Sequence, residues 1–188
     1  MKILGMTYHK GEAKMYLKPD SALLVNDKPF YIPPFAKEVE IHPCAVVRIS
    51  RLGKNIAPKF AYRYFDGLTM GMNMVATDVL ETALETHQPW MQAVSFDNSL
   101  IVGRMHDAAE ESFDNWELRM DEKPVGSWTM YDLVMPIEDA ISRLSSVVSI
   151  RMGDMIAVDF RTKALPAQVG TKAEGWINEE ICFSNKIR

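Results

Sequence analysis

Cysteine is scarce in this chain of 188 residues, which contains only Cys44 and Cys182. Two thiols so far apart in sequence make no disulfide framework of the kind that stabilises small secreted domains, and they form no paired thiol motif for zinc. We expect both to be ordinary buried or half-buried thiols. The fold must then be stabilised by an apolar core, for which the 47% of hydrophobic residues is ample.

Long hydrophobic runs and clusters of positive charge are also missing. The apolar stretch in residues 1–6 is too short for a secretory signal, and charged residues interrupt every later apolar run before it reaches membrane-spanning length. The formal net charge is −4 and no run of lysine or arginine occurs, so nothing attracts a phosphate backbone or an anionic lipid surface. We predict a cytoplasmic protein that binds neither nucleic acid nor membranes.

Repeats and linkers rich in proline or serine are missing too, which predicts one domain over residues 1–188. Most of the chain consists of short segments rich in β-branched and aromatic residues, bounded by turn-forming residues. The clearest helix runs from Pro136 to Val148, where apolar residues recur at helical spacing, and shorter ones are predicted over 59–65 and from Asp78 through Glu85. The fold class is therefore α+β, dominated by β. Strands are predicted at 14–18, 46–52, 67–75, 99–105, 115–120, 155–160 and 175–183.

Three segments carry a family pattern in one order and spacing. Leu17-Lys18-Pro19 is the first, residues 46–56 (VVRISRLGKNI) followed by 60–66 are the second, and residues 71–79 (GMNMVATDV) are the third. They resemble, in turn, the Phe/Leu-Lys-Pro segment, the central strand with its Gly-Lys turn and short helix, and the Ala-Arg-Asp-hydrophobic-Gln segment of the fumarylacetoacetate hydrolase family. The resemblance extends from about Met15 to the carboxyl terminus.

The resemblance implies a mixed β-roll with flanking helices, similar to the C-terminal domain of fumarylacetoacetate hydrolase. It implies a homodimer, and it makes residues 1–14 a shortened amino-terminal lid. In the family, a Glu-x-Glu pair and a downstream Asp hold magnesium, which chelates the oxygens of a small keto acid. A His–Glu pair on the lid activates water or moves a proton.

The family's metal-ligand positions carry different residues in this chain. Counting back from Gly53 without a gap puts the Glu-x-Glu pair on His42 and Cys44, and the third ligand falls on Asn73. Magnesium depends on anionic oxygen ligands, whereas imidazole and thiolate suit softer metals such as zinc. We therefore expect no magnesium cofactor, with a zinc site at His42 and Cys44 as the alternative.

A second alignment would restore two carboxylates. Glu38-Val39-Glu40 lies just upstream and also reads as Glu-x-Glu, but using it requires four extra residues, absorbed by a bulge or loop at Pro43. In an extended segment, Glu38, Glu40, His42 and Cys44 share one face. The simplest interpretation of that face is a half-exposed strand edge that Pro43 interrupts.

Other family positions have lost polarity as well. The catalytic lysine falls on Val94, the Arg and Gln on Thr77 and Leu80, and the Thr-Gly-Thr-Pro loop on residues 158–161. The resemblance keeps Lys18 and Asp78 as candidate substrate-binding residues. His9 and Glu12 retain the His-x-x-Glu spacing and are the candidate remnant of the catalytic dyad.

These changes favour a family member that has lost the magnesium-dependent hydrolase, decarboxylase or isomerase chemistry and serves as a non-catalytic binding or structural protein. The alternative is an enzyme on small keto acids, acylpyruvate-like or oxaloacetate-like, with a rearranged metal site. A third possibility is a metal-free site for a small carboxylate, contacted by Lys18 and Arg161.

Overall fold

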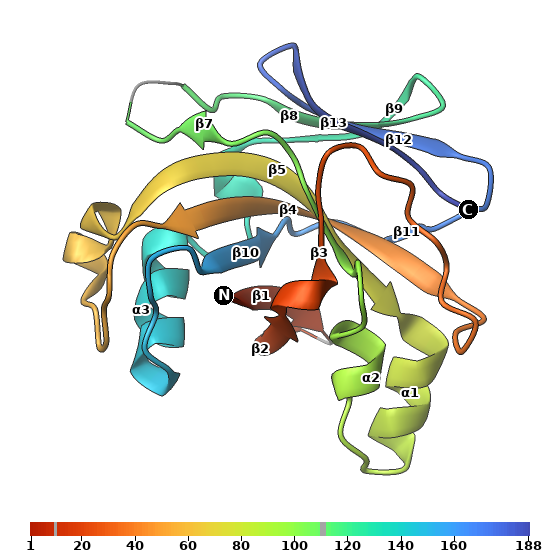
Figure 1. Cartoon of the computed structure of the whole chain (residues 1–188), viewed down its shortest axis with the longest axis horizontal. Helices are drawn as coiled ribbons and strands as arrows, with labels where there is room; N and C mark the ends of the chain where they lie inside the picture. Colours follow the sequence, from red (N-terminus) through yellow and green to blue (C-terminus); the bar gives the residue numbers. More distant parts are fainter. Residues whose placement is uncertain (10, 110–111) are drawn as a thin grey trace.

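Two β-sheets and three α-helices form the structure, a computed structural model that describes residues 1–9, 11–109 and 112–188. In the larger sheet the strand order is β2-β1-β10-β4-β5-β6-β3, with β11 added beside β4 and β7 beside β5 (Figure 1). Its strands are β1 (Lys2–His9), β2 (Glu12–Pro19), β3 (Leu23–Leu24), β4 (Val39–Ile49), β5 (Phe65–Ala76), β6 (Leu100–Val102), β7 (His106–Asp107), β10 (Met155–Asp159) and β11 (Leu165–Pro166).

The smaller sheet has the order β13-β12-β8-β9 and lies beyond β5 and β7 in Figure 1. Its strands are β8 (Trp116–Met120), β9 (Lys123–Trp128), β12 (Lys172–Ile177) and β13 (Glu180–Lys186). The helices are α1 (Thr77–Glu85), α2 (Met91–Val94) and α3 (Ile137–Val147), with short 3-10 turns at Asp20–Ala22, Pro58–Arg63 and Met130–Asp132. This is the mixed, β-dominated α+β class that the sequence predicts.

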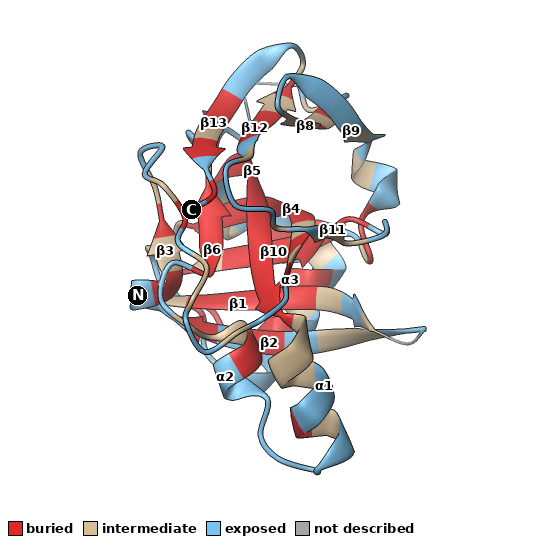
Figure 2. Cartoon of the chain, turned by 90° about the vertical axis from the view of Figure 1, so that its right-hand side faces the viewer, coloured by how far each residue is buried: buried red, intermediate tan, exposed pale blue. Residues whose placement is uncertain are grey.

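The core is built on the alternation of β4, the long central strand. Ile41, Ala45 and Val47 belong to the main apolar cluster, whereas Cys44 and Val46 belong to a second cluster on the opposite face, with Tyr16. Both faces of β4 are therefore covered, which explains its almost continuous apolar sequence. Figure 2 shows the resulting buried band through β1, β10, β4 and β5.

Helix α3 covers one end of the larger sheet, near β1 and β10 (Figure 1). Its buried face carries Ile137, Ala140, Ile141 and Leu144, as the helical spacing predicts. Pro136 is the residue before the helix, not its first residue, and its carbonyl accepts the Ala140 N–H at 3.0 Å.

Some element predictions are wrong. Residues 175–183 do not form one strand, because Asn178 and Glu179 have positive φ and turn the chain between β12 and β13. The predicted helix at 59–65 is a 3-10 turn, and the predicted strand at 99–105 narrows to β6. Among the described residues, no helix is both long and apolar enough to cross a membrane.

Candidate functional site

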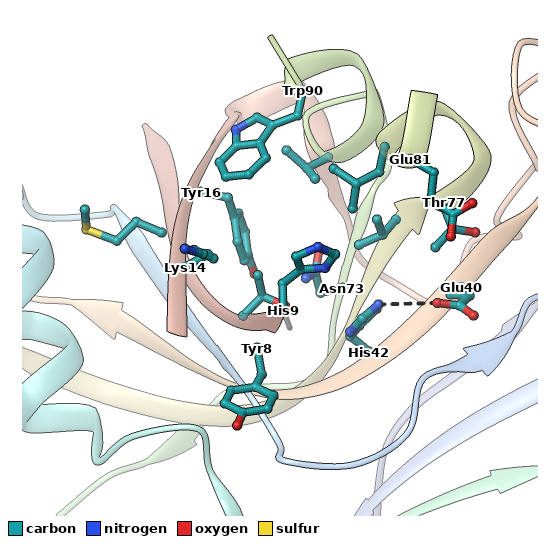
Figure 3. A pocket seen from close by; sticks show the side chains of 15 residues that line it. Tyr8, His9, Lys14, Tyr16, Glu40, His42, Asn73, Thr77, Glu81 and Trp90 are labelled. Carbon is teal, nitrogen blue, oxygen red and sulfur yellow. Dashed lines mark ion pairs between the residues drawn. The ribbon is translucent and has the colours of Figure 1, made fainter. Parts of the chain in front are cut away.

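A pocket of about 160 Å³ opens at one end of the larger sheet, where β1, β2, β4 and β5 meet α1 and α2 (Figure 3). Cys44 and Cys182 are buried free thiols, and neither lines this pocket. Most of its polar lining residues come from the strands, while α1 adds Thr77 and Glu81. Its described lining residues are Thr7, Tyr8, His9, Lys14, Met15, Tyr16, Glu40, His42, Asn73, Val75, Thr77, Leu80, Glu81, Trp90 and Val94.

Strand register brings polar side chains together beneath the pocket. His42 on β4 lies directly opposite Asn73 on β5, and Asp159 on β10 lies opposite Cys44 on β4. Residues paired across neighbouring strands present their side chains on the same face of a sheet. The polar cluster of His42, Asn73 and Asp159 therefore comes from three strands, of which β10 is distant in sequence from the other two.

Asp159 is the buried carboxylate of this cluster, with 1% of its surface exposed. The Asn73 amide donates to its two oxygens at 3.2 and 3.4 Å. Burial raises the pKa of Asp159 to about 7, although hydrogen bonds from Thr7 and Asn73 and the charge of Lys18 act in the opposite direction. Its carboxyl group can therefore gain or lose a proton near neutral pH.

His42 separates Asp159 from the open pocket. Its Nδ1 lies 3.8 Å from Asp159 Oδ2, and its Nε2 lies 4.0 Å from Glu40 Oε2, which is the contact drawn in Figure 3. Burial, followed by the charges of Lys18 and His9, lowers the pKa of His42 to about 4. The imidazole is therefore neutral near pH 7, and it forms ion pairs with these two carboxylates only when it is protonated.

Within the described residues, four buried polar atoms of the pocket have no hydrogen-bond partner: His9 Nε2, Tyr16 Oη, His42 Nε2 and Asn73 Oδ1. Folded proteins rarely leave such atoms unpaired, because each costs about 1–3 kcal/mol when buried away from water. In Figure 3 the four side chains surround the same space, so that both donor and acceptor groups face it. This convergence marks a place for a polar ligand.

Lys18, the predicted substrate-binding lysine, lies behind Tyr16 and is fully buried. Its ammonium donates to Ser99 Oγ at 2.9 Å, to the Ser99 carbonyl at 3.1 Å and to the Val94 carbonyl. Burial lowers the pKa of Lys18 to about 7, while Asp159 and Cys44 act to raise it. The structure therefore places Lys18 beside the polar cluster and not on the pocket surface.

His9 and Glu12, the candidate dyad, lie in different environments. Most of residues 1–14, the expected lid, lies in the sheet as β1 and the start of β2, and His9 pairs in register with Glu12 at the end of that hairpin. His9 lines the pocket, whereas the Glu12 carboxylate is exposed and forms an ion pair with Lys14.

Asp78 lies in the first turn of α1 and is not among the lining residues. Its carboxylate accepts the Lys37 N–H at 2.9 Å, and its hydrogen bonds to backbone N–H groups lower its pKa against the effect of burial. Asp78 thus ties the start of α1 to the segment that precedes β4.

Strand β4 also bears on the choice between the two alignments. Its register with β5 is unbroken from Val39 to Arg48, so the bulge at Pro43 that the second alignment requires is not present in this fully described strand. Nor is β4 an edge strand, because it lies between β10 and β5. Glu40 does share the pocket face with His42, while Glu38 precedes the strand and is exposed.

The donor groups at the positions where the resemblance predicts metal ligands do not suit magnesium. They are the His42 imidazole, the Asn73 amide and the thiol of Cys44, whose pKa is raised by burial and by Asp159. No group of three or more histidine, cysteine, aspartate or glutamate side chains that could hold a metal ion occurs in the described part of the chain. A magnesium ion held in the family's manner needs more anionic oxygen than this set provides.

Sequence reasoning missed Asp159 and Tyr16. The resemblance predicts a lost polar loop at residues 158–161, yet Asp159 brings a carboxylate into the polar cluster from β10. The signal was a charged residue ending the apolar run Met155–Val158, a position that a surface turn explains equally well. Tyr16 alternates with Lys14 and Lys18 on β2, and the strand period alone places all three on one face.

Comparisons with known proteins agree with this fold. Residues 5–158 match the family model described as fumarylacetoacetate hydrolase C-terminal. A solved structure from Yersinia pestis, described as a fumarylacetoacetate hydrolase family protein, superposes with a TM-score of 0.89 at 20% identity over 100% of this chain and 92% of the other. The fumarylpyruvate hydrolase of Pseudomonas aeruginosa, solved with Mn²⁺ and pyruvate, gives 0.84 at 18% identity over 100% and 89%.

Sequence relatives point the same way. An uncharacterized protein of Pyrococcus abyssi is 27% identical over 94% of this chain and 82% of its own length. A mitochondrial oxaloacetate tautomerase of Arabidopsis thaliana is 24% identical over 100% of this chain and 86% of that protein. The chain belongs to the fumarylacetoacetate hydrolase family.

Proposed function

We propose that this protein binds a small keto acid and catalyses its keto–enol tautomerisation with its own side chains, without the family's magnesium. The observation that carries the proposal is the convergence of four unpartnered polar atoms on one pocket. A keto acid and its enol offer both acceptor oxygens and a donor hydroxyl, which is the mixture that Tyr16 Oη and Asn73 Oδ1 need as partners.

Tautomerisation is proposed because it requires only two proton transfers. The carbon next to the ketone loses a proton, its electron pair forms the new carbon–carbon double bond, and the carbonyl oxygen gains a proton. Nothing else is consumed. His42 Nε2 takes the carbon proton as a neutral base, and Tyr16 Oη donates to the oxygen, each to be restored from solvent or by the reverse step.

Asp159 supports His42 in this scheme. Its carboxyl group lies 3.8 Å behind Nδ1 and has a pKa of about 7, so it can stabilise the imidazolium that forms when His42 takes a proton. The oxaloacetate tautomerases among the relatives, which match up to the full chain, support the same reaction class.

A non-catalytic binding protein is the second candidate. The replacement of the family's anionic ligands by His42, Cys44 and Asn73 favours it, as does the enclosure of Asp159. The pocket would then bind a small carboxylate without turning it over.

One experiment distinguishes the two candidate functions: NMR in the presence of EDTA monitors the exchange of deuterium into the carbon next to the ketone. We expect wild-type protein to accelerate exchange of a small keto acid over buffer, and His42→Gln to reduce that acceleration by about 100-fold or more. Saturable binding with exchange at the buffer rate would contradict catalysis and favour the second candidate.

A further inference from the structure

The pocket has a distinct apolar end. Leu80 on α1, Val94 on α2 and Val75 on β5 line it, and Trp90, just before α2, closes it with 36% of its surface exposed. In Figure 3 the Trp90 indole lies at the helix side of the pocket, near the Tyr16 ring and away from Glu40 and His42. A ligand held by the polar cluster would extend its other end toward these side chains.

The size of the pocket suits a ring. Its volume is about 160 Å³, and an apolar cavity of roughly 150 Å³ is known to take up benzene. A flat apolar group beside Trp90 would also gain an aromatic contact worth about 0.5–1.5 kcal/mol beyond its buried area. A second carboxylate in the same place would lose its hydration and would contact only apolar side chains.

The charges of the walls disfavour a dicarboxylate. Glu40 and Glu81 both line the pocket, and among its described lining residues Lys14 is the only lysine or arginine. Lys14 is already paired with Glu12. The Lys18 ammonium lies behind the pocket lining, where it donates hydrogen bonds to carbonyl oxygens and to the Ser99 hydroxyl. One ligand carboxylate can approach Lys14, but a second would face carboxylates without a free cation beside it.

Resting on the tautomerase function proposed above, we infer that the substrate is a 2-oxo acid with one carboxylate and an apolar side chain of about aryl size. Its carboxylate lies toward Lys14 at the rim, its oxo group among Tyr16, His42 and Asn73, and its side chain against Trp90. The reaction is the proton exchange already described, in which the benzylic or alkyl carbon loses the proton and the oxo oxygen gains it.

The test compares phenylpyruvate with oxaloacetate in calorimetric binding and in enol-to-keto conversion followed by ultraviolet absorbance. We expect phenylpyruvate to be preferred by about 10-fold or more in both. Trp90→Ala should weaken phenylpyruvate by about 10-fold and change oxaloacetate little, while Glu81→Lys on the exposed face of α1 should improve oxaloacetate. Met91→Ala, next to Trp90 but outside the pocket lining, is the matched control and should behave as wild type.

The outcomes distinguish this inference from the function on which it rests. Preferred binding of oxaloacetate, or equal losses for both acids in Trp90→Ala, would overturn the substrate class while leaving tautomerisation intact. Preferred binding of phenylpyruvate without any conversion would support the substrate class and overturn the tautomerase function. Absence of binding to either acid would overturn both.

Discussion

At the residue scale, the site is defined by polar atoms that the fold buries and leaves unpaired. Burying a polar group without a partner costs free energy, and a protein retains such groups where a ligand or a reaction uses them. Tyr16 and Asn73 are 6% and 1% exposed, so water does not freely satisfy them. Each should therefore contribute more to binding than to stability, which is the reverse of an ordinary buried polar residue.

Tyr16→Phe tests this directly. The substitution removes only a hydroxyl that has no partner, so we expect the free energy of unfolding to stay the same or to rise by up to about 1 kcal/mol. Binding of a keto acid should weaken by about 10-fold, since a hydrogen bond to the ligand is lost. Thermal unfolding and calorimetry measure both quantities, with Tyr131→Phe as a control because Tyr131 is 97% exposed. A clear loss of stability in Tyr16→Phe would show that its hydroxyl is a structural group.

Asp159 should leave a signature in the pH dependence of stability. Its folded pKa of about 7 lies above the unfolded value of about 3.9, so the fold prefers the protonated form. That contribution is complete below about pH 4 and is lost as the pH rises through about 7. Asp159→Asn should remove this loss, on the order of 2–4 kcal/mol, from urea unfolding measured between pH 4 and pH 8.

Lys18 titrates in a different window. Its folded pKa of about 7 lies below the unfolded value of about 10.4, so its contribution to stability is present at high pH and is lost as the pH falls toward 7.

The control for Asp159→Asn is the replacement of an exposed carboxylate, Glu179→Gln, which should leave the whole pH profile of stability in place. An Asp159→Asn profile identical to wild type would contradict the perturbed pKa of Asp159.

At the element scale, the β1–β2 hairpin positions the pocket. Gly5 on β1 lies opposite Tyr16 on β2, and a Cβ added at Gly5 would come within 1.9 Å of the Tyr16 ring. Glycine at this point therefore lets the tyrosine lie flat over β1 with its hydroxyl at the pocket. The ring also lies 5.4 Å from the Lys18 ammonium, so the hairpin holds the polar cluster together from one side.

Gly5→Ala should disturb both packing and binding. The new methyl group must displace the Tyr16 ring, and overpacking of this kind destabilises a core by about 1–3 kcal/mol. Chemical unfolding and a ligand titration of the same sample would report the two effects. Stability within 0.5 kcal/mol of wild type, roughly the spread of neutral substitutions, would mean that Tyr16 moves without cost.

Elements were predictable from the sequence where one period dominates a long segment. The helix at 137–147 and the central parts of β4, β5 and β10 follow from apolar spacing. The β12–β13 hairpin was missed because Asn178 and Glu179 adopt positive φ without a glycine to signal the turn. The sequence predicts that Pro43 interrupts an edge strand. Instead, Pro43 lies in the central strand β4, and its carbonyl accepts the Phe160 N–H at 2.8 Å.

The candidate site was harder to predict because it depends on register between strands that are distant in sequence. The resemblance predicts that His42 and Asn73 occupy ligand positions of the family, and the structure places the two residues opposite each other. It did not reveal that Asp159 approaches them from β10. The sequence predicts a loss of carboxylates on β4 and β5, but the carboxylate that β10 contributes becomes apparent only once the strands are paired.

At the scale of the whole molecule, the family fold carries this pocket at one end of its larger sheet. Family membership fixes the scaffold and leaves the reaction to be decided by the site. The homodimer and the cytoplasmic location implied by resemblance and composition stay predictions, and sedimentation velocity would test the first. A sedimentation coefficient typical of a 21.3 kDa monomer at micromolar concentration would contradict the dimer.

Dependence on metal most directly tests the proposed chemistry, since His42, Asn73 and Asp159 are proposed to replace the family's magnesium. The measurement is the rate of enol-to-keto conversion of phenylpyruvate by wild-type protein in EDTA and again after addition of magnesium or manganese. We predict a rate above buffer that neither EDTA nor added metal changes by more than about twofold, and that Asp159→Asn lowers by about 100-fold. Loss of activity in EDTA with recovery on adding magnesium would contradict it.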